Sequence, residues 1–299
     1  MFFEAARASV FWDVPVFFMI TGALLLNPEK KLSIKHILLY IRRVLLVIFI
    51  FGVPCAILMT MMELNVKVIN WEVIQISFVS VIENTALGHF WYLYVLTGIY
   101  LILPLLKIFV KNANNVEIIF LMVSLLIFDF VFPLISKIGG IDIAFNIPLT
   151  YPCFYMLLGY LMSKSKNQLM RYRKTAAIVV FTLFAFSWIL NYTTIVDATI
   201  LFSYSSPIIV LYAAGLFMLF ATGNWKTRDY IWNIDRLCFA VYIIHVLLIQ
   251  FCYRVLKIQP IHCVLYPAQT FAFGVIFTVS SFLGAWALYK IKPLKKYVL

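Results

Sequence analysis

Residues 9–26 read SVFWDVPVFFMITGALLL and residues 37–62 read ILLYIRRVLLVIFIFGVPCAILMTMM, and these two apolar runs decide the fold class. Each is close to or longer than the roughly 20 helical residues that cross a hydrocarbon core of about 30 Å. The connection between them, NPEKKLSIKH at residues 27–36, carries three lysines, and Arg42 and Arg43 open the second run. Two membrane helices joined by a basic loop are therefore predicted.

The basic loop also predicts the direction of the first helix. Loops rich in Lys and Arg stay in the cytoplasm, because these side chains are costly to move across a bilayer. Residues 9–26 are then expected to run from outside to inside, with the N-terminus of the chain outside. We expect one further membrane helix before Met1, since such a helix would explain this orientation simply.

The composition of the whole chain extends this prediction. Hydrophobic residues make up 64% of the sequence and charged residues 12%, which is far outside the range of soluble domains. We predict an all-α polytopic transmembrane helix bundle of about nine helices, in a single domain over residues 1–299. The expected spans are 9–26, 37–62, 89–109, 116–136, 148–162, 176–195, 205–222, 238–256 and 269–290.

The net charge of +12 is explained by this topology. Most of the 24 Lys and Arg residues fall in segments that nine alternating crossings leave in the cytoplasm, including the C-terminal tail at residues 290–296. We therefore expect a multi-pass protein of the cell (plasma or inner) membrane and no binding of nucleic acid. Membrane lipids are expected partners, because basic tails of this kind contact anionic headgroups.

The longest connection without a clear span, residues 63–88, alternates apolar and polar side chains. Such a segment suits a helix that lies in the membrane interface or folds back over the bundle. It could serve as a lid or only as an anchor, and the sequence leaves both open.

Two ionisable residues fall inside predicted spans. Asp129 lies near the middle of the fourth span, where a charged carboxylate is costly unless it is paired or faces water. It is either a functional group or a residue that is protonated or caps a broken helix. His245 lies in the eighth span and could exchange a proton near neutral pH, although a lone histidine there is also often a hydrogen-bonded packing residue.

Three further features lie near predicted membrane boundaries. His89 is a candidate acid or base at the outer surface, and Trp91 follows it where amphipathic rings are favoured. Arg42 and Arg43 could bind a phosphate in bidentate fashion or act only as topology anchors. The cysteines show no CxxC pair and no spacing with histidine that would predict a metal site.

Several of these fragments, taken in order, resemble the membrane-bound acyltransferase type 3 family. They are VPVFFMITGALL at 14–25, Arg42-Arg43 at the head of the next helix, HFWYLY at 89–94 and FAVYIIH at 239–245. The likeness covers essentially the whole chain. It implies a bundle of about ten helices that uses cytoplasmic acyl-CoA, usually acetyl-CoA, as co-substrate to acylate a hydroxyl of a cell-surface or lipid-linked glycan.

The resemblance suggests roles for the residues above. We expect no bound cofactor and no metal. The expected assignments are Arg42, Arg43 and Tyr242 for acyl-CoA, His245 and His89 as catalytic candidates, and Trp91 beside the acceptor, with Asp129 as a further candidate.

The chain departs from the family pattern in two ways. Thr21 stands where members often have serine before Gly22, which keeps a hydroxyl. The family's best candidate for the catalytic base is a histidine on the first membrane helix, preceded by an arginine, and this sequence contains neither. Two alternatives therefore stay open: a transporter or flippase of a lipid-linked sugar that uses Asp129, and a non-catalytic remnant of the family.

Overall fold

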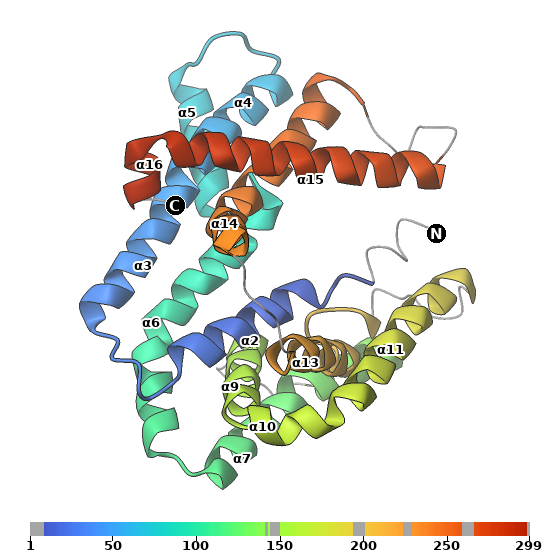
Figure 1. Cartoon of the computed structure of the whole chain (residues 1–299). Helices are drawn as coiled ribbons and strands as arrows, with labels where there is room; N and C mark the ends of the chain where they lie inside the picture. Colours follow the sequence, from blue (N-terminus) through green and yellow to red (C-terminus); the bar gives the residue numbers. More distant parts are fainter. Residues whose placement is uncertain are drawn as a thin grey trace. The chain divides into compact units, whose positions relative to one another are not determined.

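The computed structural model describes residues 9–140, 143, 150–193, 201–223, 229–258 and 266–297. These residues form helices joined by short connections and contain no strand. The predicted all-α fold is therefore confirmed. Figure 1 shows the helices in chain order.

The chain forms two compact units. The first joins Met1–Ser33 to Leu101–Trp225, and the second joins Ile34–Tyr100 to Lys226–Leu299. Each unit is thus assembled from segments that are distant in the sequence. The assignment of residues 1–299 to one domain stays a prediction.

The first unit contains α2 and the helices from the second half of α6 to α13. Their bounds are α2 Asp13–Leu25, α6 Trp91–Asn112, α7 Asn115–Leu126, η3 Ile127–Val131, α8 Phe132–Gly139, α9 Tyr151–Lys164, α10 Lys166–Leu169, η4 Met170–Tyr172, α11 Arg173–Thr193 and α13 Pro207–Ala221. The helix α13 packs against α2, α9 and α11. A small core around Phe202, Ile209 and Tyr212 lies at this junction.

The closest helix packing in the first unit is between α2 and α9 (Figure 1). A Cβ atom added to Gly22 of α2 would lie 2.0 Å from the carbonyl oxygen of Met156 on α9. A Cβ atom added to Gly159 of α9 would lie 2.1 Å from the carbonyl oxygen of Met19 on α2. The two backbones can approach this closely only because glycine has no side chain, as is common between membrane helices.

The second unit contains the N-terminal half of α6 and the remaining helices. Their bounds are α3 Ile34–Val47, η1 Ile48–Gly52, α4 Val53–Glu63, α5 Trp71–Ile82, η2 Gly88–Phe90, α14 Asp229–Gln250, η5 Phe251–Val255, α15 Tyr266–Lys290 and α16 Lys292–Tyr297. Its core brings together residues of α3, α4, α6 and α14, with Val47, Phe90, Leu93 and Ile243 almost fully buried. This core supports the start of α6 against α14.

Six helices among the described residues are long and apolar enough to cross a membrane. They are Ile34–Glu63, Gly88–Asn112, Asn115–Gly139, Lys166–Leu190, Leu237–Arg254 and Phe271–Lys290. Each of them corresponds to a predicted span. The protein is therefore a multi-pass membrane protein.

The other three predicted spans, 9–26, 148–162 and 205–222, also form helices where they are described, and these helices are shorter than the six above. The helices α2, α9 and α13 have 13, 14 and 15 residues. The helix α2 is shorter than the predicted span 9–26 because residues 9–12 form turns. The helix begins at Asp13, whose side chain accepts a hydrogen bond from the N–H of Val14. The ends of predicted spans at residues 148–149 and 194–195 lie outside the described residues.

The connection at residues 63–88 contains the helix α5. Its amphipathic pattern is realised with Val73, Ser77 and Val81 buried, while Trp71 is 70% exposed. Asn70 caps the N-terminus by accepting a hydrogen bond from Val73 at 2.8 Å. The helix packs against α4, which agrees with one of the two alternatives, a segment that folds back over neighbouring helices.

Candidate functional site

The second unit brings together three of the predicted site residues, His89, Tyr242 and His245. The rings of His89 and His245 are 5.6 Å apart between centroids and nearly perpendicular, at 75°. The ring of Tyr242 lies 5.6 Å from His89 and 5.9 Å from His245. His89 comes from η2 and the other two from α14, where a spacing of three residues places them on one helix face.

The sequence analysis treated His89, at the outer surface, and His245, inside a span, separately, and the contact between them was not predicted. The physical reason is that η2 and the start of α6 pack against the middle of α14, where Phe90 and Ile243 belong to one core. As a result His89 is only partly exposed, and both its ring nitrogens are buried.

A hydrogen bond fixes Tyr242 to the chain segment that carries His89. The hydroxyl of Tyr242 donates to the backbone carbonyl of His89 at 2.6 Å. The same Tyr242 ring is flanked by Tyr92 and Phe239, at 6.0 and 6.5 Å between centroids. Tyr242 therefore holds η2 against α14 and sets the position of His89 next to His245.

The hydrogen bond of His245 indicates its tautomer. Its Nδ1 atom lies 3.1 Å from the carbonyl oxygen of Val241. A carbonyl can only accept, so Nδ1 carries the proton when this bond forms, and in the neutral ring Nε2 keeps its lone pair. His245 thus has the arrangement of a histidine that can accept a proton at Nε2.

His89 is the unusual member of the group. Both of its ring nitrogens are buried, and neither has a hydrogen-bond partner among the described residues. Leaving a buried polar group unpaired costs about 1–3 kcal/mol, and native structures contain few such groups. One N–H and one lone pair of His89 are therefore left without a hydrogen-bond partner among the described residues.

Trp91 lies at the start of α6, two residues after His89. Its ring packs edge-on against Tyr92 at 6.4 Å, and Tyr92 in turn contacts Tyr242. An aromatic series thus leads from Trp91 to the two histidines. Such rings can cover the apolar face of a sugar, the role that was expected for Trp91.

Arg42 and Arg43 lie on α3, also in the second unit. Both are exposed. The guanidinium of Arg42 lies over the ring of Tyr297 on α16, 5.9 Å from its centroid, which is a cation–π arrangement. Their exposure leaves the guanidinium groups accessible to a phosphate from solvent.

Asp129 is the one predicted site residue in the first unit. It lies in the π-helical segment η3, and its Oδ2 atom is buried without a hydrogen-bond partner among the described residues. The sequence-based alternatives for Asp129, a functional group or a protonated or helix-capping residue, both stay open.

Each of these residues was predicted from the sequence, but two features of the second unit were not: the role of Tyr92 and an apolar groove. Tyr92 was quoted within a motif without a role, although it links Trp91 to Tyr242. An apolar groove in the second unit, between α4 and the end of α14, was not predicted at all. Apolar residues that line a groove look the same in sequence as those that face lipid. Within the described part of the chain, no group of three or more His, Cys, Asp or Glu residues could hold a metal ion.

Comparison with known proteins identifies the family. A family model described as an acyltransferase domain, that of the acyltransferase 3 family, matches residues 1–290. Comparisons with curated proteins and with solved structures gave no match. The family match covers nearly the whole chain and includes every candidate site residue described above. This chain therefore belongs to the acyltransferase 3 family, whose members are membrane acyltransferases.

Proposed function

We propose that this protein transfers an acetyl group from cytoplasmic acetyl-CoA to a hydroxyl of a cell-surface or lipid-linked glycan. The observation that carries the proposal is the contact between His89 and His245. One histidine has an accepting Nε2 atom, and the other has buried nitrogens without partners among the described residues. Family membership supports acyl transfer in general.

In the proposed reaction, Nε2 of His245 takes the proton of the acceptor hydroxyl as its oxygen attacks the thioester carbonyl. A donated N–H from His89 stabilises the negative charge that develops on the carbonyl oxygen. The carbon–sulfur bond then breaks, and the CoA sulfur takes the proton from the His245 imidazolium. The products are an O-acetyl ester and the free CoA thiol.

The proposed roles of the other residues follow from their surroundings. Arg42 and Arg43 bind the CoA phosphates, because exposed guanidinium groups match phosphate geometry. Tyr242 positions His89 through its hydrogen bond and borders the acyl path. Trp91 covers one face of the acceptor sugar. In this arrangement the cytoplasm supplies acetyl-CoA and the N-terminal end of α6 faces the acceptor side.

The experiment is an acetyl-transfer assay with the chain in proteoliposomes. Acetyl-CoA labelled in the acetyl group is supplied with a lipid-linked glycan fraction extracted from bacterial membranes. We expect release of the CoA thiol together with label that enters the glycan fraction and is freed by mild alkali, as an O-ester is. Label that resists alkali would contradict an ester product. Thiol release without label in the glycan would contradict this acceptor class.

The alternative of a sugar transporter rests on Asp129, whose Oδ2 atom lacks a hydrogen-bond partner in the described residues. Buried carboxylates of this kind serve as proton sites in transporters. The same proteoliposomes distinguish the two functions, because a transporter would take up labelled sugar along a proton gradient without acetyl-CoA.

A further inference from the structure

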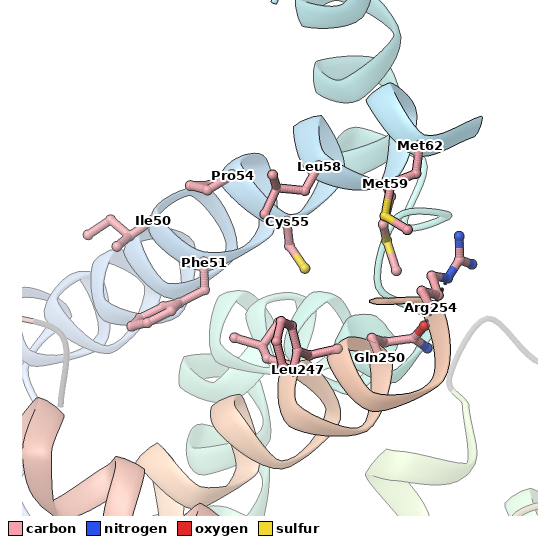
Figure 2. Close-up of a pocket in the computed structure, with 11 residues that line it drawn as sticks. Ile50, Phe51, Pro54, Cys55, Leu58, Met59, Met62, Leu247, Gln250 and Arg254 are labelled. Carbon is pink, nitrogen blue, oxygen red and sulfur yellow. Dashed lines mark hydrogen bonds between the residues drawn. The ribbon is translucent and has the colours of Figure 1, made fainter. Parts of the chain in front are cut away.

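The second unit contains an apolar groove that the proposed reaction does not use. It has a volume of about 300 Å³ and lies between η1 and α4 on one side and the end of α14 with η5 on the other. Figure 2 shows Ile50 and Phe51 at one end, Cys55 and Leu247 near the middle, and Arg254 at the other end.

The groove lies on a different face of α14 from the candidate reaction centre. Leu247 and Gln250 follow His245 by two and five residues, which corresponds to rotations of about 200° and 140° around the helix. Both line the groove, whereas His245 does not. Occupancy of the groove and acyl transfer can therefore be tested separately.

The dimensions and location of the groove suit a lipid chain. Both of its walls are candidate membrane spans, Ile34–Glu63 and Leu237–Arg254, so hydrocarbon is the medium around it. Its lining from residue 50 to residue 62 covers about 18 Å of helix, close to the depth of one leaflet in a core of about 30 Å. A single acyl chain along this path would contact mainly aliphatic side chains, Phe51 and Phe251.

The polar end of the groove determines which lipid fits. Apolar contact alone gives little preference within a membrane, because lipid tails are as apolar as leucine. At this end Arg254 donates to Gln250 at 3.0 Å and forms an ion pair with Glu63 at 3.1 Å. The side chains of Arg254 and Glu63 are 41% and 66% exposed, and exposed ion pairs are weak, so a ligand can separate them.

We propose that this groove binds one acyl chain of a phosphatidylethanolamine molecule, with its headgroup at the Arg254–Glu63 pair. The phosphate accepts hydrogen bonds from the Arg254 guanidinium, and the primary ammonium donates to the Glu63 carboxylate. The headgroup thus carries an anionic phosphate that pairs with Arg254 and a cationic ammonium that pairs with Glu63. Phosphatidylglycerol offers the phosphate but no cation, which leaves Glu63 beside an added negative charge. The proposal does not depend on the acyl-transfer reaction.

The test is native mass spectrometry of the purified full chain with equal amounts of phosphatidylethanolamine and phosphatidylglycerol. We expect phosphatidylethanolamine to be retained about tenfold more strongly, which is the effect of one hydrogen bond to a charged group. Arg254→Gln should weaken both lipids, while Glu63→Gln should remove the preference between them. Lys67→Gln and Glu83→Gln change exposed charges that do not line the groove, and should leave binding unchanged.

A second pair of variants tests whether the chain enters the groove. Cys55→Phe places a large side chain in it, and Cys55→Ala at the same position leaves it open. We expect the Phe variant alone to lose lipid, with both variants eluting as folded protein in size-exclusion chromatography. If Cys55→Ala binds lipid and Cys55→Phe, folded, binds it equally, the groove is not the site. Equal retention of both lipids by the wild-type chain would overturn the proposed headgroup.

Discussion

At the residue scale, the position of His89 depends on one hydrogen bond from α14. Tyr242 donates its hydroxyl to the His89 carbonyl at 2.6 Å, and the two rings lie 5.6 Å apart. Through this hydrogen bond Tyr242 acts as a positioning residue for His89. Its removal should change the rate of the reaction more than the binding of acyl-CoA.

We therefore predict that Tyr242→Phe lowers kcat about three- to tenfold with KM for acetyl-CoA unchanged, because a typical hydrogen bond contributes about 0.5–1.5 kcal/mol. Tyr94→Phe is the matched control, since Tyr94 donates to the carbonyl of Val81. Steady-state acetyl transfer in proteoliposomes measures both constants. A rise in KM with kcat unchanged would show that Tyr242 contacts acyl-CoA and does not position His89.

Arg42 and Arg43 carry a separate prediction. If they bind CoA phosphates, the double change to glutamine should raise KM for acetyl-CoA about tenfold or more with little effect on kcat, because phosphate contacts made equally in ground and transition states affect binding alone. Lys67→Gln removes an exposed charge from the predicted outer side and serves as the control. An unchanged KM in a folded double variant would show that neither arginine binds the CoA phosphates.

At the element scale, the packing of α2 on α9 depends on Gly22 and Gly159. Neither position can hold a Cβ atom without moving the facing backbone, which lies within 2.1 Å of that atom. Gly98 on α6 has nothing within 4 Å of such an atom and provides a comparison in a helix of the same protein.

We predict that Gly22→Ala destabilises the protein by about 1–3 kcal/mol, as overpacking does, and Gly159→Ala similarly. Gly98→Ala should be neutral or stabilising by up to about 1 kcal/mol, because alanine has the higher helix propensity. Thermal unfolding in detergent, followed by size-exclusion chromatography, ranks the three variants. A Gly22→Ala protein as stable as Gly98→Ala would contradict the close crossing of α2 and α9.

The sequence predicts helices well here, because long apolar runs and basic connections are local signals. All nine expected spans are mainly helical where they are described. The short lengths of α2 and α13 were not predicted, since turns such as residues 9–12 are as apolar as the helix that follows. The contact of His89 with His245 was also missed, because it depends on how η2 packs against α14 and no local pattern records that.

At the scale of the whole molecule, the untested prediction is its orientation in the membrane. The distribution of Lys and Arg predicts that residues 63–88 lie outside and that residues 164–174 lie in the cytoplasm. Lys67 and Lys166 belong to these two segments, and both are exposed.

We predict that a cysteine at position 67 reacts with a membrane-impermeant maleimide on intact cells, whereas one at position 166 reacts only after permeabilisation. Both substitutions are made in a variant whose five native cysteines are replaced by serine. Labelling in the reverse order would show that the topology is the inverse of the predicted one. Arg42 and Arg43 would then lie outside, where they could not bind cytoplasmic acyl-CoA.

The central claim is that His245 removes the acceptor proton, and the most direct measurement is acetyl transfer by His245→Gln beside His36→Gln, which changes an exposed histidine on α3. A general base contributes typically about 10²–10⁴-fold, so we expect the folded His245→Gln protein to lose at least about 100-fold in kcat while His36→Gln stays near wild type. Transfer by His245→Gln at the wild-type rate would contradict the claim and would place the catalytic base elsewhere.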